Sequence, residues 1–294
     1  MTNNFKINVL MTTYNLEKYV EESILSVLNQ KTDFDFNLII LDDCSKDNTI
    51  SIINSIAKSH PFGSKIELHI NEHNLGVLQN SKKIFGLAKA PYITMIDGDD
   101  YWIDMQKIQK QCAFLEENTS YNSSCSLVKS YYTSSGFSKT FVDGWHKSKN
   151  EEYSIQDYLT GPFSQTSSYF FRNNILFPDW YDNLQSNDAT IFCLATGSGK
   201  IKYFKQIFSV YRINPINYSS KKTPAKSNEK TRYFLNNIDK YFEYKYHKTI
   251  QIRLIINTVY LYFIDGKNKY SSFIGKSLVV VLFLINKFLI KNKC

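Results

Sequence analysis

"YITMIDGDDYW", residues 92–102, joins a run of β-branched and aromatic residues to three closely spaced carboxylates. The run predicts a buried strand, and Asp97, Asp99 and Asp100 follow where that strand ends. Crowded carboxylates repel one another unless a positive group lies among them, and closely spaced oxygen ligands suit a hard divalent cation such as Mg²⁺ or Mn²⁺. The stretch therefore predicts a strand that leads into a cation site, where the cation would also hold a diphosphate.

Three more strand-like segments precede this stretch, at residues 6–13, 36–43 and 65–70. A helical pattern follows each of them, and the second and third helices are expected at about residues 48–60 and 76–88. Continuous apolar strands that alternate with helices predict a parallel sheet covered on both faces, with right-handed crossovers. In such sheets ligands bind beyond the carboxyl ends of the strands.

Polar residues gather at this expected edge of the sheet. A lone aspartate in such a place also fits a helix cap or a turn, and Asp47 is expected to cap the helix that follows it. Gly76 fits an ordinary turn. Tyr101 and Trp102 fit the core as well as they fit a stacking platform. The residues at the four strand ends are Thr13, Tyr14 and Asn15; Asp42 and Asp43; Asn71 and Asn74; and Asp97, Asp99 and Asp100.

Four motifs in this order, "VLMTTYN", "IILDDCSKDNT", "NEHNLGV" and "YITMIDGDDYW", resemble the family 2 glycosyltransferases of the GT-A fold. The longer stretch "DGDDYWIDMQKIQKQCAFLEEN" is similar to one bacterial branch of that family. The resemblance covers roughly the first 215 residues. It implies a Rossmann-like α/β fold with a mixed, mainly parallel sheet flanked by helices, followed by a C-terminal helical extension.

The resemblance also implies a set of site residues. Asp99 would be the main protein ligand of Mn²⁺ or Mg²⁺, and Asp97 would assist it while approaching the ribose and diphosphate. Thr12 or Thr13, Asn15 and Asp43 would line the nucleoside pocket. The full donor-binding set is Thr12, Thr13, Tyr14, Asn15, Asp42, Asp43, Asn74, Gly76, Asp97, Gly98 and Asp99.

Three positions depart from the family pattern. Thr12 stands where many members have a proline, and Ser81 stands where many have an arginine that contacts the donor. Asn214 stands where relatives often have a histidine, so the resemblance assigns no third protein ligand to the metal.

Residues 185–214, "QSNDATIFCLATGSGKIKYFKQIFSVYRIN", predict a helix, a glycine turn and two strands. Asp188 lies near the start of that helix. Its position alone favours a helix cap that complements the helix dipole. The family resemblance instead implies that Asp188 is the general base, with "ND" in place of the more usual "ED" or "GD".

These parts imply an inverting, metal-dependent glycosyltransferase of bacterial surface glycan biosynthesis. It would move a hexosyl or N-acetylhexosaminyl group from a nucleotide donor, UDP above all, to a hydroxyl of a glycan or glycolipid acceptor. One alternative is a sugar nucleotidyltransferase, which needs a glycine-rich phosphate loop after the first strand, and "TTYNLEKYV" has none. Another is a catalytically silent glycan-binding or assembly protein of the same fold, against which Asp97, Asp99 and Asp188 argue.

The composition narrows the setting of the protein. The chain has 294 residues, 43% of them hydrophobic, which suffices for one large domain or for one domain with an appendage. Five cysteines without a CxxC pair predict neither a disulfide framework nor a zinc site. The start of the sequence shows no charged-then-apolar leader, and no run reaches the roughly 18 to 20 apolar residues of a spanning helix, so we expect a cytoplasmic protein.

The positive charge is concentrated in the tail. The chain carries +8 overall, whereas residues 225–294 hold eleven Lys and two Arg against four acidic residues, a net +9. This distribution argues against a nucleic-acid groove in the main domain. We therefore expect a catalytic domain at 1–224, with a nucleotide-sugar half at 1–120 and an acceptor half at 121–224, and a basic helical extension at 225–294.

The last apolar segment of the tail, "SLVVVLFLINKFLI" at residues 277–290, is flanked by Lys276, Lys291 and Lys293. Such a helix suits an anionic membrane surface, which would place the protein at the inner face of the membrane. It equally suits a helix packed on the catalytic domain or in an oligomer.

Overall fold

The computed structural model describes residues 5–141, 150–161, 164–184, 188–213 and 224–264. The chain divides into two compact units. The first comprises residues 1–155, 163–182 and 186–214, and the second comprises residues 156–162, 183–185 and 215–294.

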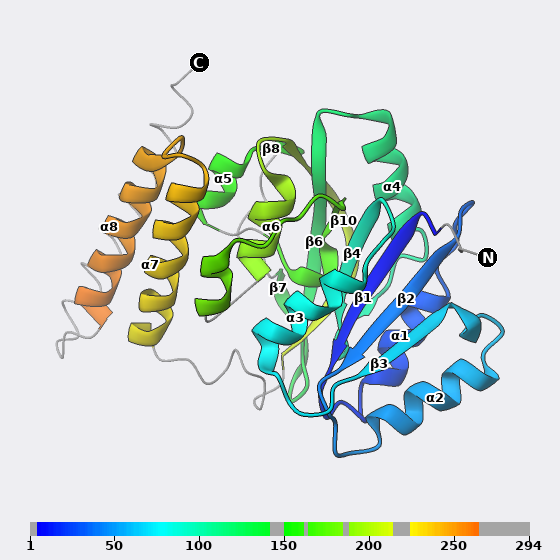
Figure 1. The fold of residues 1–294 in the computed structure, drawn as a ribbon. Coiled ribbons are helices and arrows are strands. Elements are labelled where there is room, and N and C mark those ends of the chain that lie inside the picture. Colours follow the sequence, from blue (N-terminus) through cyan, green and yellow to red (C-terminus); the bar gives the residue numbers. More distant parts are fainter. Residues whose placement is uncertain (1–4, 142–149, 162–163, 185–187, 214–223, 265–294) are drawn as a thin grey trace. The chain divides into compact units, whose positions relative to one another are not determined.

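The first part of unit 1 alternates strands with helices, as the sequence predicts (Figure 1). Its four strands pair in parallel in the order β3-β2-β1-β4. β1 and β2 are mainly apolar and almost wholly buried, as expected of central strands covered on both faces. The elements are β1 (Ile7–Thr13), α1 (Val20–Leu28), β2 (Phe36–Asp42), α2 (Thr49–Ser59), η1 (Gly63–Lys65), β3 (Ile66–Ile70), α3 (Gly76–Leu87) and β4 (Tyr92–Asp97).

The second part of unit 1 extends the same sheet in the order β9-β6-β10-β5, with β7 paired to β6 and β8 paired to β10. β9 runs antiparallel to β4 and to β6, so the expectation of a mixed sheet is confirmed. The elements are β5 (Tyr101–Trp102), α4 (Lys107–Glu117), β6 (Tyr121–Tyr132), β7 (Gly136–Phe141), β8 (Glu152–Tyr153), η2 (Thr166–Ser168), β9 (Phe170–Arg172), η3 (Asp179–Asn183), α6 (Asp188–Thr196) and β10 (Lys200–Ile213).

One local expectation is wrong. The two strands expected after the glycine turn are a single strand, β10, of 14 residues. β10 pairs with β6 along its length and absorbs register shifts between Phe204 and Ile207 and between Ile207 and Ser209. Such irregularities bend a strand without ending it, so no second turn is needed.

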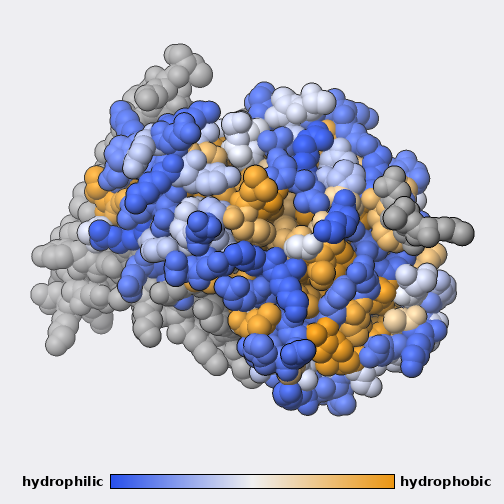
Figure 2. All heavy atoms as spheres, viewed as in Figure 1, coloured by the Kyte–Doolittle hydropathy of each residue, from blue (hydrophilic) through white to orange (hydrophobic). Residues whose placement is uncertain are grey.

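The core of unit 1 forms where α1 and α2 cover the parallel strands. Ile24 and Val27 of α1 and Ile53 of α2 are completely buried against the apolar residues of β1 and β2. β3 lies beside β2 and forms one edge of the sheet. Figure 2 shows hydrophobic residues at the surface in this region. Glu67 and His69 of β3 pair with each other at 2.7 Å, and charge of this kind disfavours pairing with another edge.

Unit 2 contains α7 (Pro224–Tyr241), α8 (His247–Ile264) and most of α5 (Ile155–Thr160). α7 and α8 pack side by side (Figure 1). Arg253 of α8 donates to the Leu159 carbonyl oxygen at 2.9 Å. The chain turns between α7 and α8, where Glu243 and Tyr244 adopt left-handed φ values of 51° and 60°. The final apolar segment of the tail, at residues 277–290, lies outside the described residues.

No helix within the described part of the chain is long and apolar enough to cross a membrane.

Candidate active site

The strand register brings the predicted strand ends together at one edge of the sheet. Thr12 is aligned with Asp97 across β1 and β4, and Thr13 with Asp42 across β1 and β2. Backbone bonds continue past the strands: Gly98 N donates to Thr12 O at 3.1 Å, and Asp43 N donates to Thr13 O at 2.9 Å. The edge is therefore a continuous rim formed by the carboxyl ends of neighbouring parallel strands.

Asp42 ties together the loops after β1 and β2. Its buried carboxylate accepts hydrogen bonds from Thr13 Oγ1 at 2.7 Å, Ser45 N at 2.7 Å and Ser45 Oγ at 2.6 Å. Asn15, at a φ of 54°, donates from N to Ser45 Oγ at 2.8 Å and accepts from Lys46 N at 2.8 Å. Tyr14 between them is 47% exposed. Donor binding by Asp42, Tyr14 and Asn15 stays a prediction.

Asp43 anchors the start of α3. Its buried carboxylate accepts from Leu75 N at 2.7 Å, from Gly76 N at 2.9 Å and from Asn71 Nδ2 at 2.9 Å. Asn74 Oδ1 also accepts from Gly76 N at 3.0 Å, and Gly76 has a φ of 77° that favours glycine. A carboxylate at a helix N-terminus is stabilising. Asp43 is thus held in a fixed position at the rim, which suits its predicted contact with the nucleoside.

Asp47 supports the start of α2 as the sequence predicts, although the N-cap residue itself is Asn48. Asp47 accepts from Thr49 N at 3.0 Å at the start of α2, and from Glu17 N at 3.0 Å. These hydrogen bonds hold the pKa of Asp47 below its ordinary value although burial opposes them.

Asp97, Asp99 and Asp188 form the acidic centre of the rim. Asp97 is partly buried, and its carboxylate accepts a hydrogen bond from Thr12 Oγ1 at 3.5 Å. Burial, followed by the negative charges of Asp188 and Asp99, raises the pKa of Asp97 to about 8. Asp188 opens α6 and is exposed. Its charge contributes to the raised pKa of Asp97, so the start of α6 lies within electrostatic range of the end of β4.

Asp100 does not belong to this exposed rim, contrary to the sequence expectation. The chain turns after β4, since Asp100 N donates to Asp97 O at 2.9 Å, and the Asp100 side chain is completely buried. Its Oδ1 accepts from Arg212 N at 2.9 Å, and its Oδ2 has no hydrogen-bond partner among the described residues. Burial and the charges of Asp99 and Asp97 raise the pKa of Asp100 well above its ordinary value.

The donor set at the rim fits a divalent cation that is completed by substrate. Among the described residues no group of three or more His, Cys, Asp and Glu side chains has the geometry of a metal site. Mg²⁺ and similar ions are often held by one or two carboxylates together with substrate phosphates and water. Asp97 and Asp99 supply two carboxylates whose mutual repulsion a cation would relieve. Asn214, the position of the missing histidine, lies outside the described residues.

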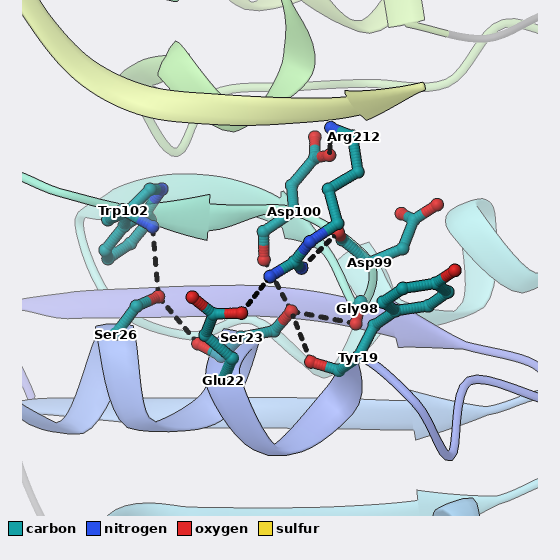
Figure 3. A network of polar contacts seen from close by, with 9 residues as sticks. All are labelled: Tyr19, Glu22, Ser23, Ser26, Gly98, Asp99, Asp100, Trp102 and Arg212. Atoms are coloured by element: carbon teal, nitrogen blue, oxygen red, sulfur yellow. Dashed lines mark hydrogen bonds and ion pairs between the residues drawn. The ribbon is translucent and has the colours of Figure 1, made fainter. Parts of the chain in front are cut away.

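The sequence does not predict the contacts that support the acidic loop, which is the turn from Gly98 to Asp100 after β4. Figure 3 shows these contacts. Arg212 of β10 reaches the loop from one side, and Ser23 of α1 reaches it from the other. Glu22 of α1 contacts Arg212 instead of the loop. The sequence feature that could have indicated these contacts is the arginine within the mainly apolar run "FSVYRI". Trp102, in contrast, is core: it is 4% exposed and donates from Nε1 to Ser167 O at 2.9 Å.

Comparisons with known proteins place the chain in a family. The family model described as Glycosyl transferase family 2 matches residues 8–177. An uncharacterized protein of Mycobacterium tuberculosis is 27% identical over 207 residues, which is 70% of this chain but only 58% of that relative. A Bacillus subtilis protein named for teichuronic acid biosynthesis, TuaG, is 31% identical over 113 residues, or 38% of this chain and 43% of TuaG.

Two solved structures share the fold. Staphylococcus aureus TarS in complex with UDP-GlcNAc matches with a TM-score of 0.65 at 19% identity, over 86% of this chain and 72% of that one. Mannosyltransferase PcManGT of Pyrobaculum calidifontis, in complex with GDP-Man and Mn²⁺, matches with a TM-score of 0.59 at 13% identity, over 98% and 84%. The family match covers more than half of the chain and agrees with this fold, so the protein belongs to glycosyl transferase family 2.

Proposed function

We propose that this chain is an inverting glycosyltransferase that moves a sugar from a UDP donor to a hydroxyl of a glycan or glycolipid acceptor. The observation that carries this proposal is the placement of three carboxylates: Asp97 and Asp99 lie at the carboxyl end of β4, and Asp188 opens α6 near enough to Asp97 for its charge to contribute to the raised pKa of Asp97. In the proposed complex, Asp188 would be a base that lies beside the diphosphate of the donor.

In this proposal Asp188 takes the proton of the acceptor hydroxyl as the oxygen attacks the anomeric carbon. The bond from that carbon to the diphosphate oxygen breaks on the opposite face, and its electron pair leaves with the nucleoside diphosphate. One displacement inverts the anomeric configuration. A divalent cation held by Asp99 and Asp97 would neutralise the charge that develops on the leaving diphosphate.

The choice of donor and metal draws on the neighbours. TarS has been solved with UDP-GlcNAc and with UDP, which supports a UDP donor and a hexosyl or N-acetylhexosaminyl group. PcManGT has been solved with GDP-Man and Mn²⁺, which supports a metal requirement. On this chain Thr12 or Thr13, Asn15 and Asp43 would contact the nucleoside.

Two alternatives from the sequence have less support. A sugar nucleotidyltransferase would need a glycine-rich phosphate loop after β1, where this chain has "TTYNLEKYV". A catalytically silent glycan-binding protein would have no use for Asp188 beside Asp97.

We also propose that the protein works in the cytoplasm at the inner face of the membrane. The net +9 of residues 225–294 supports this, because each basic residue near an anionic surface contributes about 1 kcal/mol. The intact chain should co-sediment with vesicles that contain phosphatidylserine, and the bound fraction should fall as salt is added. Unchanged binding at low and high salt would contradict the electrostatic contribution, and concentration-dependent self-association without vesicle binding would favour an oligomer.

The activity is tested by measuring hydrolysis of UDP- and GDP-sugars with and without Mn²⁺, followed by substitution of the base. Asp188→Asn cannot accept the proton, so turnover should fall by about 10² to 10⁴-fold while UDP affinity stays near that of the wild type. Asp35→Asn is the matched control, because Asp35 is an exposed carboxylate that pairs with Lys65 at the start of β2. Normal turnover in Asp188→Asn would return Asp188 to the role of a helix cap.

Asp99→Ala separates the metal from the base. This variant should lose the Mn²⁺ dependence of UDP binding as well as the activity. If UDP affinity still rises with Mn²⁺ to the wild-type extent, Asp99 is not the ligand.

A further inference from the structure

Arg212 holds two consecutive residues of the acidic loop in two different ways (Figure 3). Its guanidinium donates from Nη1 to the Asp99 carbonyl oxygen at 2.6 Å. Its backbone N donates to Asp100 Oδ1 at 2.9 Å. The side chain of Arg212 thus fixes the backbone of Asp99, and the backbone of Arg212 fixes the side chain of Asp100.

The positive charge of Arg212 is compensated by Glu22 of α1, which lies outside the rim. Nη2 pairs with the carboxylate of Glu22 on α1, and the guanidinium lies over the rings of Tyr101 and Tyr19, 4.4 Å and 5.3 Å from their centroids. Only 5% of the residue is exposed. A planar guanidinium can make these contacts at once, whereas a lysine ammonium is a point charge on a flexible stem.

Ser23 of α1 holds the loop on another side. Its Oγ lies 2.8 Å from the Gly98 carbonyl oxygen and also contacts the Asp100 carbonyl oxygen, so its single proton is shared between them. α1 and β10 together therefore restrain the backbone from Gly98 to Asp100, which is the segment that carries the Asp99 carboxylate.

We propose that Arg212 is a positioning residue that sets the orientation of the Asp99 carboxylate toward the cation and the donor diphosphate, with Glu22 as its charge partner. This inference rests on the proposed function. Loss of the guanidinium fork would release the Asp99 backbone and let its carboxylate turn away. Loss of Glu22 would leave an uncompensated positive charge close to the cation and weaken binding in the same direction.

Arg172 provides a matched control, because it does similar work far from the rim. It donates to the Tyr121 carbonyl oxygen at 3.1 Å and to the Leu115 carbonyl oxygen at 2.6 Å, and its guanidinium lies 5.6 Å from the Tyr92 ring centroid. It aligns with Tyr92 at the first residue of β4, whereas the acidic rim lies at the other end of that strand. Arg172 is only partly buried, but it holds backbone carbonyls as Arg212 does, so a purely structural effect of losing such a guanidinium should also appear in Arg172→Lys.

The experiment is calorimetric titration of the full chain with UDP at increasing Mn²⁺ concentrations. In Arg212→Lys the Mn²⁺ concentration that gives half of the affinity gain should rise about tenfold, while UDP affinity without Mn²⁺ stays unchanged. Arg172→Lys should lower the thermal unfolding midpoint without moving the Mn²⁺ dependence. An Arg212→Lys variant with the wild-type Mn²⁺ dependence overturns the inference.

Glu22→Gln gives a second test if Arg212→Lys does not fold, because the Glu22 side chain is 59% exposed and its loss is compatible with folding. The half-point for Mn²⁺ should again rise, by a smaller factor, and an unchanged half-point overturns the inference. If UDP binding to the wild type does not respond to Mn²⁺ at all, the metal of the proposed function is refuted, and the role of Arg212 with it. A wild type that responds and variants that match it refute only the role of Arg212.

Discussion

Alanine at Gly98 should distort the rim from within. Gly98 follows β4, and a Cβ at this position would lie 2.8 Å from Thr13 Cγ2, 2.9 Å from Leu16 Cδ1 and 3.1 Å from Thr12 O. The two side-chain tips can move, but the Thr12 carbonyl belongs to the backbone of β1, which also accepts the Gly98 N–H at 3.1 Å. Overpacking of this kind costs about 1–3 kcal/mol of the free energy of unfolding. Because Thr12 and Thr13 are predicted donor contacts, UDP affinity should fall too.

Gly86→Ala is the matched control for this substitution. Gly86 lies inside α3, and a Cβ there would have no neighbour within 4 Å. Alanine should therefore raise the free energy of unfolding by about 0.5–1 kcal/mol, the usual difference between the two residues in a helix. Urea denaturation followed by tryptophan fluorescence measures both variants, and calorimetry measures UDP binding. A Gly98→Ala chain with the stability and UDP affinity of the wild type would refute the reasoning.

Two further substitutions test the rim and the core. Asp43→Ala leaves the N–H groups of Leu75 and Gly76 without their carboxylate acceptor, so it should lower the free energy of unfolding by about 1–3 kcal/mol. It should also weaken UDP binding even without metal. An unchanged UDP affinity by calorimetry would show that the nucleoside binds elsewhere. Burial lowers the pKa of Lys107 well below the ordinary value of 10.5. The unfolded chain therefore binds a proton at Lys107 more readily than the folded chain does, and the wild type should gain stability as pH rises toward 10.5. Lys107→Met should thus be more stable than the wild type at pH 7, by a margin that shrinks toward pH 10; a margin independent of pH would show that the buried amine stays charged.

The sequence predicts the parallel part of the sheet well because each strand there carries its own signal. Segments such as β1 and β2 are mainly apolar and are followed by helices, and right-handed crossovers leave few ways to order them. The antiparallel part is different. β9 has three residues, and it joins β4 to β6 through contacts with residues more than 40 positions away in the chain. No local pattern in three residues specifies such a pairing.

The same distinction applies to the site. The sequence locates the strand ends and their carboxylates because topology places them at one edge. It does not show that Asp100 turns inward, since this depends on β10 pairing with β5, where Ser209 aligns with Trp102 and Val210 with Tyr101. That long-range register also brings Arg212 to the loop, and an arginine in an apolar strand shows only that some partner is required.

The rim therefore contains two kinds of carboxylate, and their contacts indicate different uses. Asp42 and Asp43 accept three hydrogen bonds each from the protein, which fixes the loops after β1 and β2 before any ligand arrives. Asp97 lies instead against the negative charges of Asp188 and Asp99, an arrangement that opposes its own ionisation. Contacts from α1 and from β10 hold the loop from Gly98 to Asp100 in place, so these carboxylates cannot easily move apart to reduce their repulsion. The repulsion is relieved when positive charge enters, so donor and cation should bind to the rim together, each more tightly in the presence of the other.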